Sequence, residues 1–168
     1  MEFKERTEQL KQIPALDNHN CFGCSPRNAS GLQMEFFSSD KSLLSRVTVP
    51  DHLCGWSNMV HGGIISAILD EIMSWSAIVQ LKKIILTKSI TVDFKHPVYT
   101  GKALMVEGKV LEVKSEREAL MEGFLYDDEG KLCSRSEGIF ALFTPEVAVK
   151  MGVMKEEDIA EFEQIFNV

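Results

Sequence analysis

The chain has 168 residues, of which 45% are hydrophobic, and this length suits one domain with a sizeable core. That hydrophobic content argues against a disordered chain. The formal net charge of −7 argues against a nucleic-acid-binding surface, although a local basic patch would still allow an anionic ligand to bind.

The N-terminal stretch, residues 2–12, is polar and charged, and it is predicted to form a short amphipathic helix that ends before Pro14. It contains no secretory hydrophobic region, and no apolar run in the chain is judged long enough to span a membrane. We therefore expect a cytoplasmic protein that binds no membrane and keeps its four cysteines reduced.

The next segment, residues 19–31, carries Cys21 and Cys24 in a C-x-x-C spacing, with His19 close by. These are zinc-ligand types, but a tetrahedral zinc site needs four ligands and this segment supplies at most three. Other candidate ligands are scattered through the chain: His52, Cys54 and Cys133. We interpret the segment as a tight turn with small buried thiols and expect no bound metal.

Two strands are predicted before the centre of the chain, because residues 31–38 and 43–49 alternate between apolar and polar side chains. Pro50 closes the second strand. Residues 51–60 form a loop, in which Asn58 is a residue type that tolerates a left-handed backbone conformation.

The central stretch begins with His61-Gly62-Gly63 and continues as a predicted helix over residues 62–81, which is apolar on most sides. One stripe of this helix consists of small residues, and Asp70 lies on it. A buried helix rarely carries a carboxylate unless that group is paired or functional. The alternatives are a functional Asp70, or an Asp70 that is only hydrogen-bonded by neighbouring hydroxyls, those of Ser66 and Ser74. Glu71 is a competing carboxylate about 100° round the helix.

Amides at the start of a helix lack intrahelical partners and carry partial positive charge, so Gly62 and Gly63 form a candidate oxyanion site. Asp70 follows Gly62 by eight residues, or roughly 12 Å at 1.5 Å per residue, so the two cannot touch one carbonyl within one chain. Two antiparallel copies related by a two-fold axis would place Gly62 of one opposite Asp70 of the other. The spacing therefore favours a composite site in a dimer.

Four strands are predicted after the helix, at residues 85–94, 102–113, 118–126 and 131–143, with Gly108 interrupting the second. Thr144 and Pro145 are a helix start signal, and the tail to Val168 is predicted to be helical.

The HGG motif with an acidic residue nine positions after its histidine, here Asp70, resembles the hotdog-fold acyl-CoA thioesterases of the phenylacetate-degradation, or PaaI-like, branch. The resemblance extends from about residue 21 to residue 143. It implies an α+β hotdog fold, in which an antiparallel sheet of about six strands wraps round one long central helix, with short N- and C-terminal helices. The chain would be a single domain, divided into an arm (1–20), a core (21–144) and a helical tail (145–168).

The resemblance also implies metal-independent hydrolysis of an acyl-CoA thioester, with coenzyme A as part of the substrate and no bound cofactor. The amide of Gly62, with or without that of Gly63, would polarise the carbonyl. Asp70 of the partner chain would act as base or nucleophile, and His61 would orient the loop. The expected assembly is a homodimer, with a homotetramer left open.

Further residues are predicted to assist this reaction. Relatives often carry a hydroxyl after the central helix that helps to position the attacking water, and Thr87 occupies that place, although a threonine in a strand is common without function. Ser89 is the fallback. The expected substrate-binding residues are Asn58, Lys88, Lys95 and His96.

Two alternative functions remain at this stage. A hotdog dehydratase or hydratase needs a histidine and a carboxylate placed together for proton transfer, and its usual histidine motif is missing. A non-catalytic acyl-CoA-binding or sensing protein is the other alternative, and the presence of Asp70 argues against it.

Overall fold

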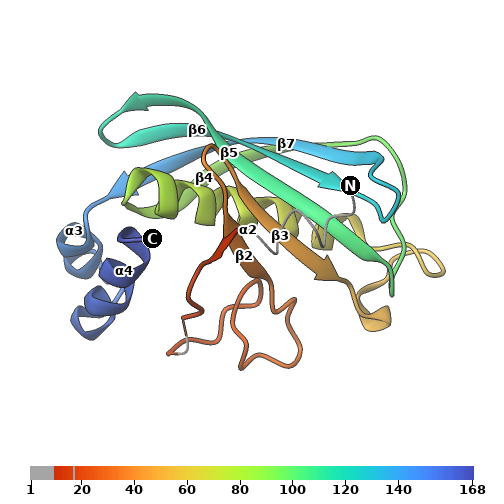
Figure 1. Cartoon of the computed structure of the whole chain (residues 1–168), viewed down its shortest axis with the longest axis horizontal. Coiled ribbons are helices and arrows are strands. Elements are labelled where there is room, and N and C mark those ends of the chain that lie inside the picture. The colour runs from red at the N-terminus through yellow and green to blue at the C-terminus, as the bar shows by residue number, and fades with distance from the viewer. Residues whose placement is uncertain (1–9, 17) are drawn as a thin grey trace.

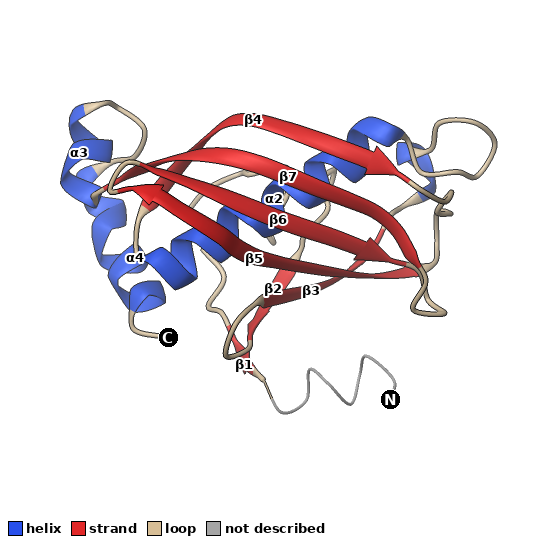
Figure 2. Ribbon diagram, turned by 90° about the horizontal axis from the view of Figure 1, so that it is seen from above, coloured by secondary structure: helices blue, strands red, loops and turns tan. Residues whose placement is uncertain are grey.

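The computed structural model describes residues 10–16 and 18–168. An antiparallel sheet covers one long helix, α2 (Gly62–Leu81), and Figures 1 and 2 show this helix lying across one face of the sheet. Two short helices, α3 (Pro145–Lys150) and α4 (Ile159–Phe166), lie together at one end of the molecule. The predicted α+β arrangement, a sheet wrapped round a long central helix, is confirmed.

The sheet has seven strands among the described residues, in the spatial order β1-β2-β3-β5-β6-β7-β4. Every neighbouring pair is antiparallel. The bounds are β1 (Lys11–Gln12), β2 (Glu35–Ser38), β3 (Leu43–Thr48), β4 (Ile84–Phe94), β5 (Ala103–Ser115), β6 (Glu118–Tyr126) and β7 (Leu132–Phe143).

One strand was not predicted. It is the two-residue β1, the first in the chain, which pairs with β2. A helix was predicted over residues 2–12, but its last part is this strand, because the chain there reaches the open edge of the sheet. Residues 1–9 lie outside the described residues. The strand predicted at residues 31–38 begins only at Glu35, since residues 31–34 are held in the preceding loop by backbone hydrogen bonds to residues 22, 23 and 28.

Helix α2 has the predicted bounds, and both of its ends are capped. His61 is the N-cap, and its Nδ1 accepts a hydrogen bond of 2.9 Å from the amide of Gly63. Lys82 ends the helix in the left-handed conformation, with φ of 56°, and its amide donates to the carbonyl of Ile78. By length and composition this helix would suffice to cross a membrane, contrary to our expectation from the sequence, but here the sheet and the flanking loops bury most of it.

The core lies between α2 and the concave face of the sheet. Its fully buried members on the helix include Ile68, Leu69, Ile72 and Met73, and those on the strands include Leu43, Val106, Met121 and Phe140. Burying one such side chain contributes about 1.5–3 kcal/mol, so this contact is the main source of stability.

Gly108 on β5 lets the helix come close to the sheet. A Cβ atom at this position would lie 2.7 Å from the carbonyl oxygen of Ile72 and 2.5 Å from Oγ of Ser76, both on α2. Its register partner on β6 is Gly123, which also faces the helix. The sequence suggested that Gly108 interrupts a strand, whereas β5 continues through it. The absence of a side chain at Gly108 lets α2 approach the sheet and does not break the strand.

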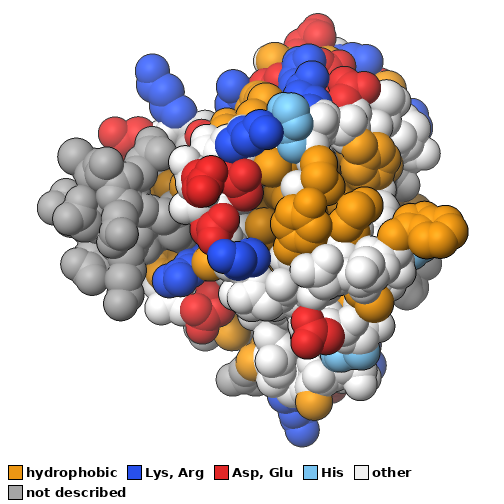
Figure 3. Space-filling model, turned by 90° about the vertical axis from the view of Figure 1, so that its right-hand side faces the viewer, with side chains coloured by type: hydrophobic (Ala, Val, Ile, Leu, Met, Phe, Trp, Pro, Cys, Tyr) orange, Lys and Arg blue, Asp and Glu red, His pale blue; other side chains and the backbone are white. Residues whose placement is uncertain are grey.

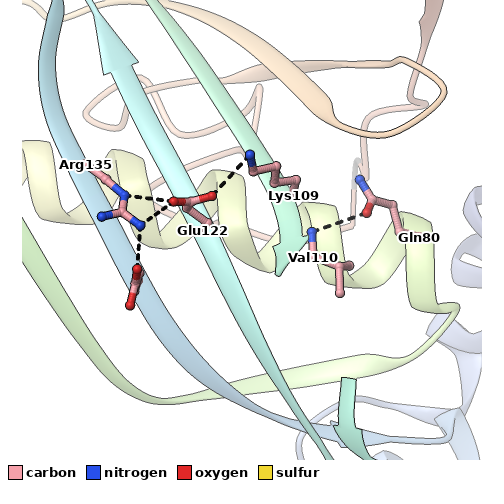
Figure 4. Close-up of polar contacts among 6 residues, drawn as sticks. Gln80, Lys109, Val110, Glu122 and Arg135 are labelled. Atoms are coloured by element: carbon pink, nitrogen blue, oxygen red, sulfur yellow. Dashed lines mark hydrogen bonds and ion pairs between the residues drawn. The ribbon is translucent and has the colours of Figure 1, made fainter. Parts of the chain in front are cut away.

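The opposite face of the sheet carries a charged network centred on Glu122 of β6 (Figure 4). Its carboxylate is buried and binds Lys109 of β5 at 3.2 Å and Arg135 of β7 at 2.6 Å. Arg135 also binds Glu137 at 2.6 Å. These partners compensate the burial of the Glu122 charge and connect the neighbouring strands β5, β6 and β7.

We predict that Gly108→Ala destabilises the protein, because the added methyl group would overlap backbone atoms of α2 that cannot rotate away. Overpacking of this kind costs about 1–3 kcal/mol, which should lower the melting temperature by about 3–10 °C. Gly62→Ala is the matched control, since a Cβ there would lie at an ordinary 3.6 Å from the Phe94 ring. Equal melting temperatures for both variants and the wild type would contradict this explanation of Gly108.

Candidate active site

Asp70 of α2 and Thr87 of β4 form a hydrogen-bonded pair. Oγ1 of Thr87 donates to Oδ1 of Asp70 at 2.8 Å, across 17 residues of sequence. The hydroxyl of Ser66, one of the alternatives considered from the sequence, instead donates to the carbonyl of Gly62 at 2.9 Å. The sheet therefore brings to Asp70 the hydroxyl that was predicted to lie near the reaction.

The environment of Asp70 suits a group that takes up a proton. Burial raises the pKa of its carboxyl above the ordinary value, while the hydrogen bond from Thr87 opposes this shift. One carboxylate oxygen accepts the hydrogen bond from Thr87. The side chain is only partly buried, so the carboxylate is still accessible to solvent. A carboxylate in this setting can act as a general base or a nucleophile.

The two glycine amides at the start of α2 differ in availability. The amide of Gly63 donates to Nδ1 of His61. The amide of Gly62 has no partner among the described residues and is positioned at the positive end of the helix dipole. Of the two predicted oxyanion donors, Gly62 is therefore the one whose amide can donate to a ligand oxygen. His61 is the N-cap of α2.

Gly62 and Asp70 are separated along a continuous helix, since α2 has no break between them. Eight residues at 1.5 Å each place them about 12 Å apart. They lie at different points of one chain, too far apart to act on one carbonyl together.

Strand β4 forms one edge of the sheet and pairs only with β7 among the described strands. Hydrophobic side chains on it are unusually open to solvent, with Phe94 55% exposed and Leu86 40% exposed. Figure 3 shows hydrophobic side chains gathered on the end of the molecule where α2 begins. Trp56, in the loop before α2, and Tyr99, which forms a β-bridge with Met59 of that loop, are further exposed aromatic residues. The edge therefore combines unpaired backbone groups with exposed apolar surface.

The predicted substrate-binding residues do not form one group. Lys88 lies at the β-bulge next to Thr87 and forms an ion pair with Glu118. Lys95 and His96 follow the end of β4, whereas Lys88 lies near the middle of this strand, and the side chains of Lys95 and His96 are exposed.

Asn58 is exposed in the loop before α2, and its carbonyl accepts a hydrogen bond of 2.9 Å from the amide of Thr100. The left-handed residue of this loop is its neighbour Ser57, with φ of 54°, and not Asn58. This hydrogen bond ties the loop to the segment after β4.

Glu71, the neighbour of Asp70, contacts a different part of the chain, which the sequence reasoning missed. Its Oε1 accepts a hydrogen bond of 3.1 Å from Nε1 of Trp75 and lies 3.8 Å from Sγ of Cys21. Burial raises the pKa of Glu71 to about 7. The C-x-x-C spacing near His19 was the available signal, but nothing in the sequence showed that this loop lies against α2.

The pKa values of the two thiols in the loop, Cys21 and Cys24, are shifted in opposite directions. A hydrogen bond from Cys24 lowers the pKa of Cys21 to about 5, and the same interaction raises the pKa of Cys24. The amide of Gly23 also donates to Sγ of Cys21, at 3.3 Å. The loop thus favours a thiolate at Cys21.

A cavity of about 340 Å³ lies beside this loop. One wall is the Glu71 side of α2, and the others come from the start of β4, the loop and helix α4; the lining includes Ser74, Ile78, Ile85 and Phe162. The lining also includes His19, Glu71 and Glu161, and it does not include Gly62, Asp70 or Thr87.

Residues 57–134 match the family model of the thioesterase superfamily, and this segment contains the HGG motif, Asp70 and Thr87. No curated protein matches the chain at a significant level.

Among solved structures, the chain is similar to a thioesterase superfamily protein, with 24% identity and a TM-score of 0.66, over 72% of this chain and 62% of that one. It is similar to the Escherichia coli PaaI protein from the phenylacetic acid degradation operon, with 17% identity and a TM-score of 0.60, over 67% and 80% of the two chains. A third similar structure is a hypothetical thioesterase of Streptococcus pneumoniae with coenzyme A, at 14% identity and a TM-score of 0.60, over 66% and 86%.

At these identities the structural likeness concerns the fold, and the family match adds the segment that carries the motif. The resemblance to PaaI-like proteins that the HGG motif and Asp70 predicted is confirmed. The chain thus has the hotdog fold of these thioesterase structures, and its residues 57–134 match the thioesterase superfamily.

Proposed function

We propose that this protein hydrolyses acyl-CoA thioesters to a free acid and coenzyme A. The observation that carries the proposal is the Asp70–Thr87 pair, a partly buried carboxylate with a raised pKa held by a hydroxyl 2.8 Å away, within the segment that matches the thioesterase family. The S. pneumoniae neighbour that was solved with coenzyme A supports this choice of leaving group.

In this mechanism the thioester oxygen accepts a hydrogen bond from the amide of Gly62, which stabilises the negative charge that develops on it. Asp70 takes a proton from a water molecule that attacks the carbonyl carbon, or it attacks the carbon itself and forms a mixed anhydride, which a water molecule hydrolyses to the free acid after coenzyme A has left. The carbon–sulfur bond then breaks, and coenzyme A leaves as a thiolate that takes up a proton. Thr87 holds one oxygen of Asp70, so that the other faces the reacting atoms.

The separation of Gly62 and Asp70 makes two chains necessary for this reaction. A homodimer joined along β4 would pair the exposed edge strand and cover Phe94 and Leu86. Its two-fold axis would bring Gly62 of one protomer to Asp70 of the other, giving two identical composite sites.

Coenzyme A carries phosphate groups, and exposed cations near the site would bind them. Lys95 and His96 are exposed at the end of β4 that lies near Gly62, as the contact position of Phe94 with Gly62 indicates. Lys88 already pairs with Glu118, so we assign it a weaker part. Asn58 precedes the helix start and would contact the substrate from the loop.

Release of free thiol from a panel of acyl-CoAs, including aromatic and medium-chain acyl groups, tests this function. We expect turnover with at least one of them. Asp70→Asn should reduce it by about 100-fold or more, because the amide keeps the shape and cannot accept the proton. Circular dichroism and melting temperature serve as controls for the fold. Tight binding of acyl-CoA with no thiol release would instead favour a binding or sensing protein.

We predict that Thr87→Val lowers turnover by about tenfold, since valine keeps the branched shape and removes the donor to Asp70; this corresponds to about 1.4 kcal/mol. Thr87→Ser retains a hydroxyl and should keep most of the activity. The substrate dissociation constant should stay unchanged in both variants. Wild-type turnover of Thr87→Val would show that Thr87 is only a strand residue.

A further inference from the structure

The loop that precedes β2 brings three metal-binding side chains together. One candidate ligand atom from each of His19, Cys21 and Cys24 lies within 4.8 Å of the other two. The sequence placed these residues near one another but left the number of ligands at three. On that count we expected no metal.

The fold supplies a fourth ligand from a distant part of the chain. The two carboxylate oxygens of Glu71, on α2, lie 3.8 and 3.9 Å from Sγ of Cys21, and Glu71 also interacts with Cys24. In a tetrahedral zinc site with ordinary bond lengths, a sulfur and a carboxylate oxygen are about 3.6 Å apart. The Cys21–Glu71 pair is therefore already close to the spacing that zinc requires, while Glu71 lies outside the group of three whose ligand atoms are within 4.8 Å of one another and would close on the ion as it binds.

His19 provides an independent sign of a missing ligand. The amide of Cys21 donates to its Nδ1 at 3.2 Å, at the long end of the hydrogen-bond range, and its Nε2 is buried without a partner among the described residues. Buried polar atoms are almost always satisfied by protein, water or an ion. A cation beside the two thiols and the carboxylate would bind Nε2, and its binding would move the ring proton to Nδ1 and replace the weak hydrogen bond from the Cys21 amide.

The backbone of the loop is shaped for this cluster. The amide of Gly23 donates to Sγ of Cys21 at 3.3 Å, a contact that favours the thiolate needed for metal binding. A Cβ atom at Gly23 would collide with the carboxyl group of Glu71, so only glycine lets that group approach the loop. Hydrogen bonds from Leu32 and Met34 to the carbonyls of residues 22 and 23 hold the loop in place.

We propose that His19, Cys21, Cys24 and Glu71 bind one zinc ion. Thiolate ligands favour zinc over magnesium or calcium, and four protein ligands make a closed, structural site. The ion fastens the loop to α2 at the residue next to Asp70 and forms part of the wall of the 340 Å³ cavity, which all four ligands line. It takes no part in the hydrolysis, and it reverses our expectation from the sequence of a metal-free loop.

The test is the zinc content of untagged protein, purified with a non-chelating reductant and measured by elemental mass spectrometry. We expect about one zinc ion per chain in the wild type. Cys54→Ser is the matched control, because Cys54 is an exposed thiol outside the cluster, and it should keep the zinc. Cys24→Ser and Glu71→Gln should each weaken zinc affinity by tenfold or more.

If a variant fails to fold, a second measurement on the wild type still tests the proposal. Removal of the metal and titration with Co²⁺ should give the thiolate-to-cobalt charge-transfer absorption of a tetrahedral site, and added Zn²⁺ should abolish it. A wild-type protein that binds neither ion stoichiometrically overturns the proposal. So does a Cys21–Cys24 disulfide in the protein as isolated, or zinc that persists unchanged in both Cys24→Ser and Glu71→Gln.

Discussion

The close approach of α2 to the sheet is the constraint on which the rest of the structure depends. It requires a residue without a side chain at Gly108, where any Cβ would meet the carbonyl of Ile72. Because the helix is held at this depth, Ile68, Leu69 and Ile72 are fully buried, and Asp70 comes within hydrogen-bond distance of Thr87 on β4. Packing and the candidate chemistry thus have the same origin, and a shift of the helix would disturb both.

Two adjacent carboxylates on this helix have different surroundings, because successive residues point about 100° apart. Asp70 faces β4 and its single hydroxyl partner. Glu71 faces the loop that carries Cys21 and the indole of Trp75. One helix therefore separates a group suited to reaction from a group suited to fastening a loop. Burial raises the pKa of both, and the partners, rather than the burial, distinguish them.

The fold was largely predictable from the sequence, since the bounds of α2 and the alternating strands after it follow from local periodicity. The HGG spacing also indicated Asp70. Contacts between distant segments were not predictable: the meeting of Glu71 with the Cys21 loop depends on where that loop packs, and the role of Gly108 depends on the depth of the helix. The strand at Lys11–Gln12 was missed because two residues are too few to show a period, and their structure is set by the neighbouring edge of β2.

The central claim is that each site combines Gly62 of one protomer with Asp70 of another, and mixing two inactive variants tests it most directly. Asp70→Asn and Gly62→Val should each be inactive as homodimers, the second because its side chain blocks access to the amide. After verified subunit exchange, a mixed dimer has one site with both substitutions and one with neither. About half of the dimers take this form, so the mixture should regain roughly a quarter of the wild-type activity. If both groups act from the same chain, every site carries one substitution, and a mixture that stays inactive after exchange would contradict the account.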